Sequence, residues 1–340
     1  MYPDIPIKDV YMFFDEIQLV DKWELFILRI YKSYCKNIYV SGSNAQMLSR
    51  ELSSALRGWP LEYEEFPLSF NEFCRFKNIK TNGFTEIDRI RLKNAFMEFN
   101  HSSAFPEVVL IPEKSMKDRK LQGYFNTMLF RDLIEHYQLN NPEVVRYFLK
   151  RVMANLSKPT SINSIFNDLK SQGLKVGKDK LYELAEHCCS IFLFFRVPKY
   201  DRSMIKENSS LPKYYCIDNG IRNAVLLPQS DDDGKLLENT VFLALRRVLK
   251  PCDKILYFQG TKECDFVVQQ NDQIVHLIQV TWDMRDKETR KREIDGIVEA
   301  SRVTGCDSLI ILTNNEEGEI TEEGKTIKIL PVWKWLLFQE

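Results

Sequence analysis

A run of five apolar residues that ends in two carboxylates limits the fold of this chain more than any other feature. The run is Val10-Tyr-Met-Phe-Phe14, and Asp15 and Glu16 follow it directly. A short apolar run of this kind is typical of a buried parallel strand. We therefore predict a parallel strand whose carboxyl end places both acids in a cleft.

A helix and a second strand are predicted to follow. The helix is indicated by apolar residues at helical spacing, namely Trp23, Phe26, Ile27 and Ile30. The next apolar run, residues 37–40, ends in Ser41-Gly-Ser43-Asn44. Polar residues after both strands predict an α/β unit whose site lies at the carboxyl edge of its sheet.

The composition indicates several folded domains. The chain has 340 residues, of which 44% are hydrophobic and 28% charged, and its formal net charge is -1. This length suits about two or three domains, and this apolar content excludes general disorder. The near-zero net charge excludes a basic coat over the whole surface, but it leaves a local basic face open.

We divide the chain into four regions that together predict a multidomain α/β protein. Residues 1–67 hold the strand–helix–strand unit and a strand-like segment from Pro60 to Phe66, and residues 68–155 are mostly helical. Residues 156–205 predict two short helices and then a hairpin that begins with a strand over 191–195, which is the plan of a winged helix.

The last region, residues 206–340, alternates between helices and strands. Turns are predicted at Asp231–Gly234 and Asn314–Gly318. Two helices are expected over 236–249 and 287–303. Strands are expected over 254–258, 264–269, 274–280, 308–312 and 326–330.

Asp15 and Glu16 are the strongest candidates for chemistry. At a strand end, an aspartate can organise Mg²⁺ through its water shell and a glutamate can polarise an attacking water. A solvated turn with two acids fits the spacing equally well. Ser43 and Asn44 could contact a γ-phosphate, or they could cap the next helix. Arg57 could stabilise phosphate charge, or it could be an ordinary surface arginine.

The order of these motifs resembles the predicted prokaryotic AAA+ ATPases that carry a winged helix and a nuclease-like domain after the ATPase module. The motifs are Phe13-Phe-Asp-Glu-Ile-Gln18, Val40-Ser-Gly-Ser-Asn44, Leu56-Arg-Gly58, Phe66-Pro-Leu-Ser-Phe-Asn-Glu-Phe73, Ala104-Phe-Pro-Glu-Val108 and Arg131-Asp132. The resemblance implies a partial P-loop NTPase domain that uses ATP and Mg²⁺. In it, Asp15 and Glu16 match the Walker B pair, and Ser43 or Asn44 the sensor. Arg57 then matches an arginine near the nucleotide.

Two departures from that family pattern matter. The family's Arg-Gly-Arg reads Arg57-Gly58-Trp59 here, and the phosphate loop G-x-x-x-x-G-K-[ST] does not occur in the sequence. Gly173–Asp179 has the wrong spacing and an aspartate where the Mg²⁺-binding hydroxyl belongs. Because the loop's backbone and lysine hold the phosphates, we expect an N-terminally truncated chain that does not hydrolyse ATP alone.

A second set of residues resembles the PD-(D/E)XK nuclease pattern. The resemblance implies that Glu238 and Asp265 hold a metal ion, Mg²⁺, with Gln279 in place of the second strand acid and Thr281 in place of the lysine. A neutral amide is a poorer Mg²⁺ ligand than a carboxylate. The alternatives are therefore a Mg²⁺-dependent nuclease and a retired nuclease scaffold that binds a partner or packs.

The predicted winged helix carries a small basic cluster at Lys175, Lys178 and Lys180. Such a cluster suits phosphate contacts to DNA, or it is a solvated face in a module that binds protein. DNA binding and self-association are therefore the predicted kinds of partnership.

The cysteine pattern and the lack of a long apolar run indicate the cellular compartment that we expect for the protein. The eight cysteines are scattered and form no C-x-x-C pair, which favours reduced thiols and a cytoplasmic protein. No signal peptide is visible, and no apolar run is long enough to cross a bilayer. We expect no membrane partner.

Overall fold

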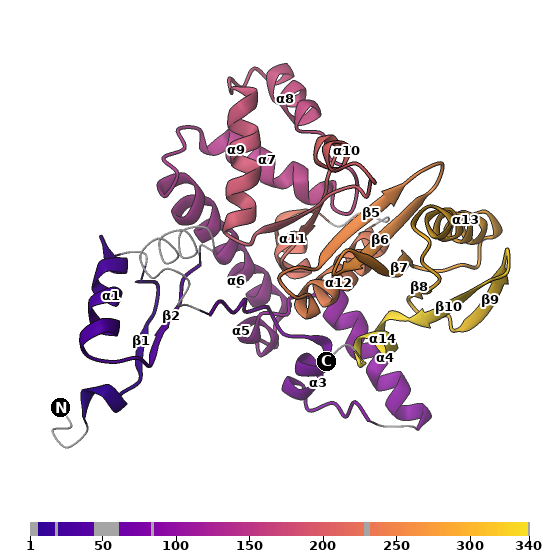
Figure 1. The fold of residues 1–340 in the computed structure, drawn as a ribbon, viewed down its shortest axis with the longest axis horizontal. Helices are drawn as coiled ribbons and strands as arrows, with labels where there is room; N and C mark the ends of the chain where they lie inside the picture. The colour runs from indigo at the N-terminus through magenta and orange to yellow at the C-terminus, as the bar shows by residue number, and fades with distance from the viewer. Residues whose placement is uncertain (1–5, 18–19, 44–60, 83–84, 228–231, 339–340) are drawn as a thin grey trace. The chain divides into compact units, whose positions relative to one another are not determined.

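The structure is a computed structural model that describes residues 6–17, 20–43, 61–82, 85–227 and 232–338 (Figure 1). The chain divides into two compact units. The N-terminal unit comprises residues 1–65 with 185–193, and the C-terminal unit comprises 66–184 and 194–340. Each unit is described by itself.

The N-terminal unit contains the predicted strand–helix–strand. The 3-10 helix η1 (Ile7–Asp9) precedes β1 (Met12–Phe14), α1 (Trp23–Ser33) and β2 (Ile38–Val40). The two strands pair in parallel, with Met12 opposite Ile38 and Phe14 opposite Val40. Trp23 and Ile27 of α1 are buried, and Phe14, Ile38 and Val40 pack against them.

The strand β1 is only partly buried, although the sequence predicts a buried strand. Its residues alternate between the two faces of the sheet, as they must in any strand. Phe14 packs toward α1, whereas Phe13 is 73% exposed. The Phe13 ring stacks on Tyr39 with ring centroids 5.0 Å apart. The apolar run therefore has one packed face and one open aromatic face.

Helices occupy most of the segment in which helices are predicted. They are α3 (Phe70–Phe76), α4 (Glu86–His101), α5 (Pro106–Val109), α6 (Lys114–Thr127), the π-helical η3 (Met128–Glu135) and α7 (Pro142–Ala154). The strand predicted over Pro60–Phe66 is wrong, because Leu61–Phe66 form neither helix nor strand and Pro60 lies outside the described residues. Helix α3 begins after Ser69, which forms a capping box with Glu72.

The next elements agree in part with the predicted winged helix. Helices α8 (Ile162–Ser171) and α9 (Lys178–Ser190) precede β3 (Phe194–Val197), which pairs antiparallel with β4 (Lys213–Cys216). The strand begins at Phe194 rather than Ile191. Helix α10 (Met204–Ser209) separates the two strands, so that β4 lies beyond the predicted boundary at 205. The winged helix stays a prediction.

A six-stranded mixed sheet organises the rest of the C-terminal unit, in the order β5-β6-β7-β8-β10-β9. The strands are β5 (Lys254–Gln259), β6 (Glu263–Gln270), β7 (Gln273–Thr281), β8 (Leu309–Thr313), β9 (Gly318–Glu322) and β10 (Lys325–Pro331). Strands β7 and β10 each pair in parallel with β8. Strand β6 pairs antiparallel with β5 and β7, and β9 pairs antiparallel with β10. The predicted strands are present, but β9 was not predicted. The nuclease-like fold stays a prediction.

Four helices accompany this sheet in the C-terminal unit. They are α11 (Asn219–Val225), α12 (Asp232–Val248), α13 (Lys287–Thr304) and α14 (Val332–Leu336). The turn predicted at Asp231–Gly234 is wrong, because residues 232–234 form the first turn of α12.

Helix α13 packs against β6, β7 and β8 over a continuous apolar core. Gly296 permits the close approach, since a Cβ there would lie 2.1 Å from the Glu263 carbonyl oxygen. Ile297, Val298 and Leu277 are among the fully buried residues of this core. Within the described ranges, neither α13 nor any other helix is both long and apolar enough to span a membrane.

Candidate functional site

The predicted polar edge of the N-terminal unit is assembled by the pairing of β1 with β2. Asp15 and Glu16 follow β1, and Ser41 and Ser43 follow β2. The Ser41 hydroxyl donates a hydrogen bond to Asp15 Oδ1. The Ser43 hydroxyl donates to Glu16 Oε2 at 3.3 Å. We call these four residues the strand edge.

The backbone turns sharply at the strand edge. Glu16 has a φ of 48°, in the left-handed region that costs an L-residue about 1–2 kcal/mol. The next residue, Ile17, is buried, and its N–H donates to the Ser41 carbonyl oxygen at 3.3 Å. The turn therefore ties the end of β1 to β2. Strained backbone of this kind is frequent at functional sites.

The two acids of the strand edge are open to solvent. Asp15 is exposed and Glu16 is partly exposed, so both carboxylates are accessible to a ligand. Mg²⁺ prefers oxygen ligands and keeps several of its waters, and hydroxyl groups can hydrogen-bond such waters. The residues present therefore fit a hydrated Mg²⁺ ion. Asn44 and Arg57, the other predicted site residues here, lie outside the described residues.

The predicted basic cluster of the winged helix lies on exposed surface. Lys175, Lys178 and Lys180 are all exposed. Lys180 pairs with Glu183 at 2.6 Å, and Lys178 Nζ lies 6.0 Å from the Tyr182 ring centroid. Neighbours on α9 thus engage two of the three lysines, and DNA contact through them stays a prediction.

The predicted acids of the C-terminal unit meet around a buried lysine. Lys213 of β4 is fully buried, and its Nζ lies 3.0 Å from Glu238 Oε1 and 3.1 Å from Asp265 Oδ1. It also forms an ion pair with Glu263 Oε1. Glu238 comes from α12, and Glu263 and Asp265 come from β6. We call these four residues the acid–lysine cluster.

Protein donors bind the acids of the acid–lysine cluster. The Tyr215 hydroxyl donates to Glu238 Oε1 at 2.6 Å. The Val280 N–H donates to Asp265 Oδ2 at 2.9 Å. Gln279, which replaces an acid of the nuclease pattern, accepts from the Asp265 N–H at 3.0 Å and donates to Glu293.

Burial dominates the ionisation of this cluster. It raises the pKa of Glu238 to about 8, and the nearby Asp265 charge adds to the effect. The pKa of Glu263 rises for the same two reasons. Burial alone would lower the pKa of Lys213, but the surrounding groups, Glu238 foremost, outweigh it and raise that pKa well above its usual value.

The acid–lysine cluster does not fit the Mg²⁺ ion that the nuclease resemblance implies. The ammonium already stands between the acids, and Thr281, at the family's lysine position, donates instead to the Asp283 carbonyl oxygen at 3.2 Å. Among the described residues, no group of three or more His, Cys, Asp or Glu side chains is arranged to hold a metal ion.

Lys213, Glu263 and Tyr215 were not among the site residues predicted from the sequence. The signal for Glu263 was present, because a residue two positions before Asp265 in a strand points to the same face. Lys213 carried a weaker signal, as a lysine at the start of the apolar run Tyr214-Tyr-Cys-Ile217.

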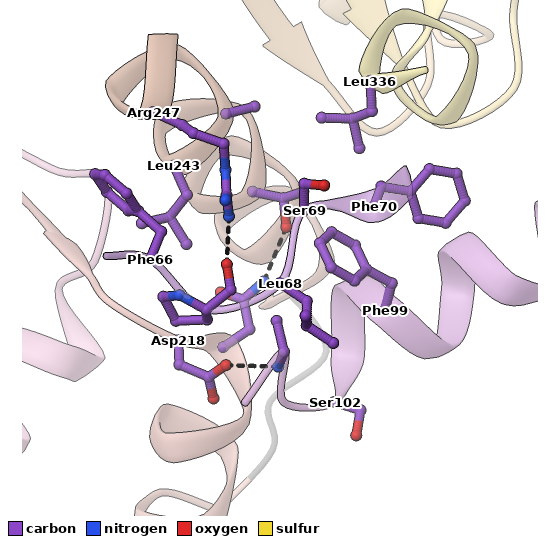
Figure 2. A pocket seen from close by; sticks show the side chains of 15 residues that line it. Phe66, Leu68, Ser69, Phe70, Phe99, Ser102, Asp218, Leu243, Arg247 and Leu336 are labelled. Atoms are coloured by element: carbon purple, nitrogen blue, oxygen red, sulfur yellow. Dashed lines mark hydrogen bonds between the residues drawn. The ribbon is translucent and has the colours of Figure 1, made fainter. Parts of the chain in front are cut away.

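A small apolar cavity of about 60 Å³ lies beside the segment that begins at Phe66 (Figure 2). Arg247 of α12 donates to the Pro67 carbonyl oxygen, and its Cζ lies 5.3 Å from the Phe66 ring centroid. The Asp218 carboxylate accepts from the Ala104 N–H at 2.8 Å. Because both charged groups are held by protein partners, we assign this cavity to packing: the Phe66–Phe73 motif anchors the chain on α12.

Comparisons with known proteins match two segments of the chain to protein families. Residues 2–74 match the AAA domain family, and residues 96–232 match a domain of unknown function, DUF8612. The N-terminal part of the chain is therefore related to AAA-type ATPases.

Two relatives match almost the whole chain. The uncharacterized protein MJ1544 of Methanocaldococcus jannaschii is 33% identical over 336 residues, which cover 96% of this chain and 74% of that protein. An uncharacterized protein of Haemophilus influenzae is 25% identical over 333 residues, which cover 97% and 78%. No solved structure matches. The chain belongs to the same protein family as MJ1544.

Proposed function

We propose that the strand edge is the Mg²⁺-nucleotide edge of an AAA-type ATPase. In this proposal Asp15 organises Mg²⁺ through its water shell, and Glu16 polarises the water that attacks the γ-phosphate. Ser43 contacts that water or the phosphate from the neighbouring strand. By family resemblance, Asn44 serves at the sensor position and Arg57 lies near the phosphates of the nucleotide.

The parallel pairing of β1 with β2 carries this proposal. The register from Met12–Ile38 to Phe14–Val40 makes both strands end at the same edge. Two carboxylates and two hydroxyls then lie at this edge as two hydrogen-bonded pairs, Ser41 with Asp15 and Ser43 with Glu16. The match of residues 2–74 to the AAA domain family supports the same function.

The proposal limits what the chain does by itself. Its sequence lacks the phosphate loop, whose backbone N–H groups and lysine hold the nucleotide phosphates. The strand edge provides side chains that act on the metal ion and the attacking water, but not the groups that hold the phosphates. We therefore expect weak binding of Mg²⁺-ATP and no hydrolysis above background by this chain alone.

The test is the binding of Mn²⁺-ATP at millimolar concentration, measured from the relaxation rate of water protons. Mn²⁺ takes the same oxygen ligands as Mg²⁺. We expect the wild-type chain to bind, and Asp15→Asn to bind about 10–100-fold more weakly, the usual loss when an outer-shell partner of a metal is removed. Glu16→Gln should keep most of the binding, because its role lies in the attack by water.

Asp21→Asn is the matched control, since Asp21 is an exposed acid in a turn of the same unit. It should bind Mn²⁺-ATP as the wild type does. Absence of wild-type binding, or equal binding by Asp15→Asn and wild type, would show that the strand edge is a solvated turn.

A further inference from the structure

The acid–lysine cluster is built as a complete cation site whose cation is a side chain. A lysine ammonium has three N–H donors and no acceptor. Its Nζ in this cluster contacts Glu238, Asp265 and Glu263. Each donor therefore has one carboxylate acceptor.

We propose that Lys213 is the resident cation of this cluster and takes the place that a divalent metal ion would otherwise occupy. The acid–lysine cluster is then a metal-independent centre that joins β4, α12 and β6. This inference is independent of the function proposed for the strand edge, because it concerns other residues in the other unit.

Geometry prevents the lysine and a metal ion from sharing the centre. Mg²⁺ needs oxygen ligands at about 2.0–2.1 Å in near-octahedral geometry. The ammonium already lies 3.0 Å from Glu238 Oε1 and 3.1 Å from Asp265 Oδ1. A second cation within that space would meet strong repulsion from the ammonium, because both are shielded from water.

The ammonium is also fixed in its place. Lys213 has no exposed surface, and its Nζ lies 5.3 Å from the Tyr257 ring centroid. Its backbone is held in β4 by the register that places it opposite Val197. Movement of the side chain to water would leave the carboxylates in a buried space without a counter-charge, which is strongly unfavourable.

Several of the oxygen atoms that could bind a metal ion already accept hydrogen bonds from the protein. Asp265 Oδ2 accepts from the Val280 N–H, and Glu238 Oε1 accepts from the Tyr215 hydroxyl as well as from Lys213. The Gln279 amide oxygen accepts from the Asp265 N–H. Protein donors therefore occupy positions at Glu238 and Asp265 that a metal ion would need, and Glu263, whose side chain is 32% exposed, is the most accessible acid of the cluster.

The test removes the ammonium and asks whether a metal ion replaces it. Lys213→Ala should lower the Tm of the full chain by about 10 °C, since it leaves buried acids without a counter-charge. Millimolar Mn²⁺ without nucleotide should restore much of that loss and bind at one additional site per chain. The Tm of the wild type, whose cluster already holds the ammonium, should rise much less with Mn²⁺ than that of Lys213→Ala. Lys213→Ala combined with Asp265→Asn should lose the restoration.

Two results would overturn the proposal. One is a Lys213→Ala chain that folds but gains no stability from Mn²⁺. The other result can be obtained even if Lys213→Ala does not fold. If the wild type binds Mn²⁺ in equilibrium dialysis and Glu263→Gln does not bind that ion, then lysine and metal coexist in the cluster. Equal Mn²⁺ binding by the wild type and Glu263→Gln would support the proposal.

Discussion

The strand edge of the N-terminal unit and the acid–lysine cluster of the C-terminal unit use the same acidic residue types in different surroundings. Asp15 is exposed and accepts a hydroxyl hydrogen bond, and it forms no ion pair with another residue of the described ranges. Asp265 is buried and faces an ammonium, which compensates its charge. A metal ion at Asp265 would have to displace the lysine ammonium, whereas an ion at Asp15 would meet no cation from the described residues.

The largest expected effect on stability is that of Lys213→Ala. Removal of one partner from a buried ion pair costs about 3–5 kcal/mol, because the remaining charges stay buried. Urea unfolding measures this loss. Lys262→Ala is the matched control, since Lys262 is exposed and adjacent to Glu263; its effect should lie within about 0.5 kcal/mol. Equal effects of the two substitutions would remove the distinction between the cluster and an ordinary surface.

The next largest effect on stability is expected at Asp218, a buried carboxylate outside the acid–lysine cluster. Burial raises the pKa of Asp218 to about 6, so that the folded chain holds this proton more tightly than the unfolded chain. Its contribution to stability is full below about pH 4 and is lost as the pH rises through 6. The loss amounts to about 3 kcal/mol, at 1.36 kcal/mol for each pKa unit.

The measurement is the difference in unfolding free energy between wild type and Asp218→Asn, from pH 4 to pH 7. This difference should shrink as the pH rises, because only the wild type carries the titrating group. Asp88→Asn gives the opposite sign at lower pH: the Thr85 hydroxyl lowers the pKa of Asp88 below 3.8, so that the wild-type advantage should grow as the pH rises toward about 4 and stay nearly constant from there to pH 7. A difference for Asp218 that stays constant would contradict the account of its burial.

The smallest effect is expected at the strand edge. Asp15→Asn should change the unfolding free energy by no more than about 0.5 kcal/mol, because the acid is exposed and its hydrogen bond to Ser41 lies at the surface. Urea unfolding of this variant beside Lys213→Ala compares the two groups of acids directly. A loss of similar size in both would mean that Asp15 serves stability, which conflicts with a role in nucleotide binding.

Much of the C-terminal fold could be read from local sequence patterns. The apolar run over 264–269 predicts β6, which spans Glu263–Gln270. The strand β9 was missed, because Gly318–Glu322 is mostly polar and exposed and gains its structure from pairing with β10. The strand predicted over Pro60–Phe66 was wrong. A strand-like pattern of apolar and polar residues does not show whether a partner strand is available for pairing.

The strand edge and the acid–lysine cluster also differ in how far they can be predicted from the sequence. The strand edge follows from sequence order, because consecutive parallel strands of an α/β unit end at one edge. The acid–lysine cluster does not, since Lys213 meets acids 25 and 52 residues away on other elements. A lysine is also expected at the surface. Only the fold shows that this lysine is buried among acids.

The most direct test of the central claim compares Mn²⁺-ATP binding by the wild type, Asp15→Asn and Asp265→Asn. The account predicts that Asp15→Asn loses most of the binding, whereas Asp265→Asn, if folded by circular dichroism, keeps it. Loss of binding in Asp265→Asn with normal binding in Asp15→Asn would place the metal at the buried acids and contradict the account.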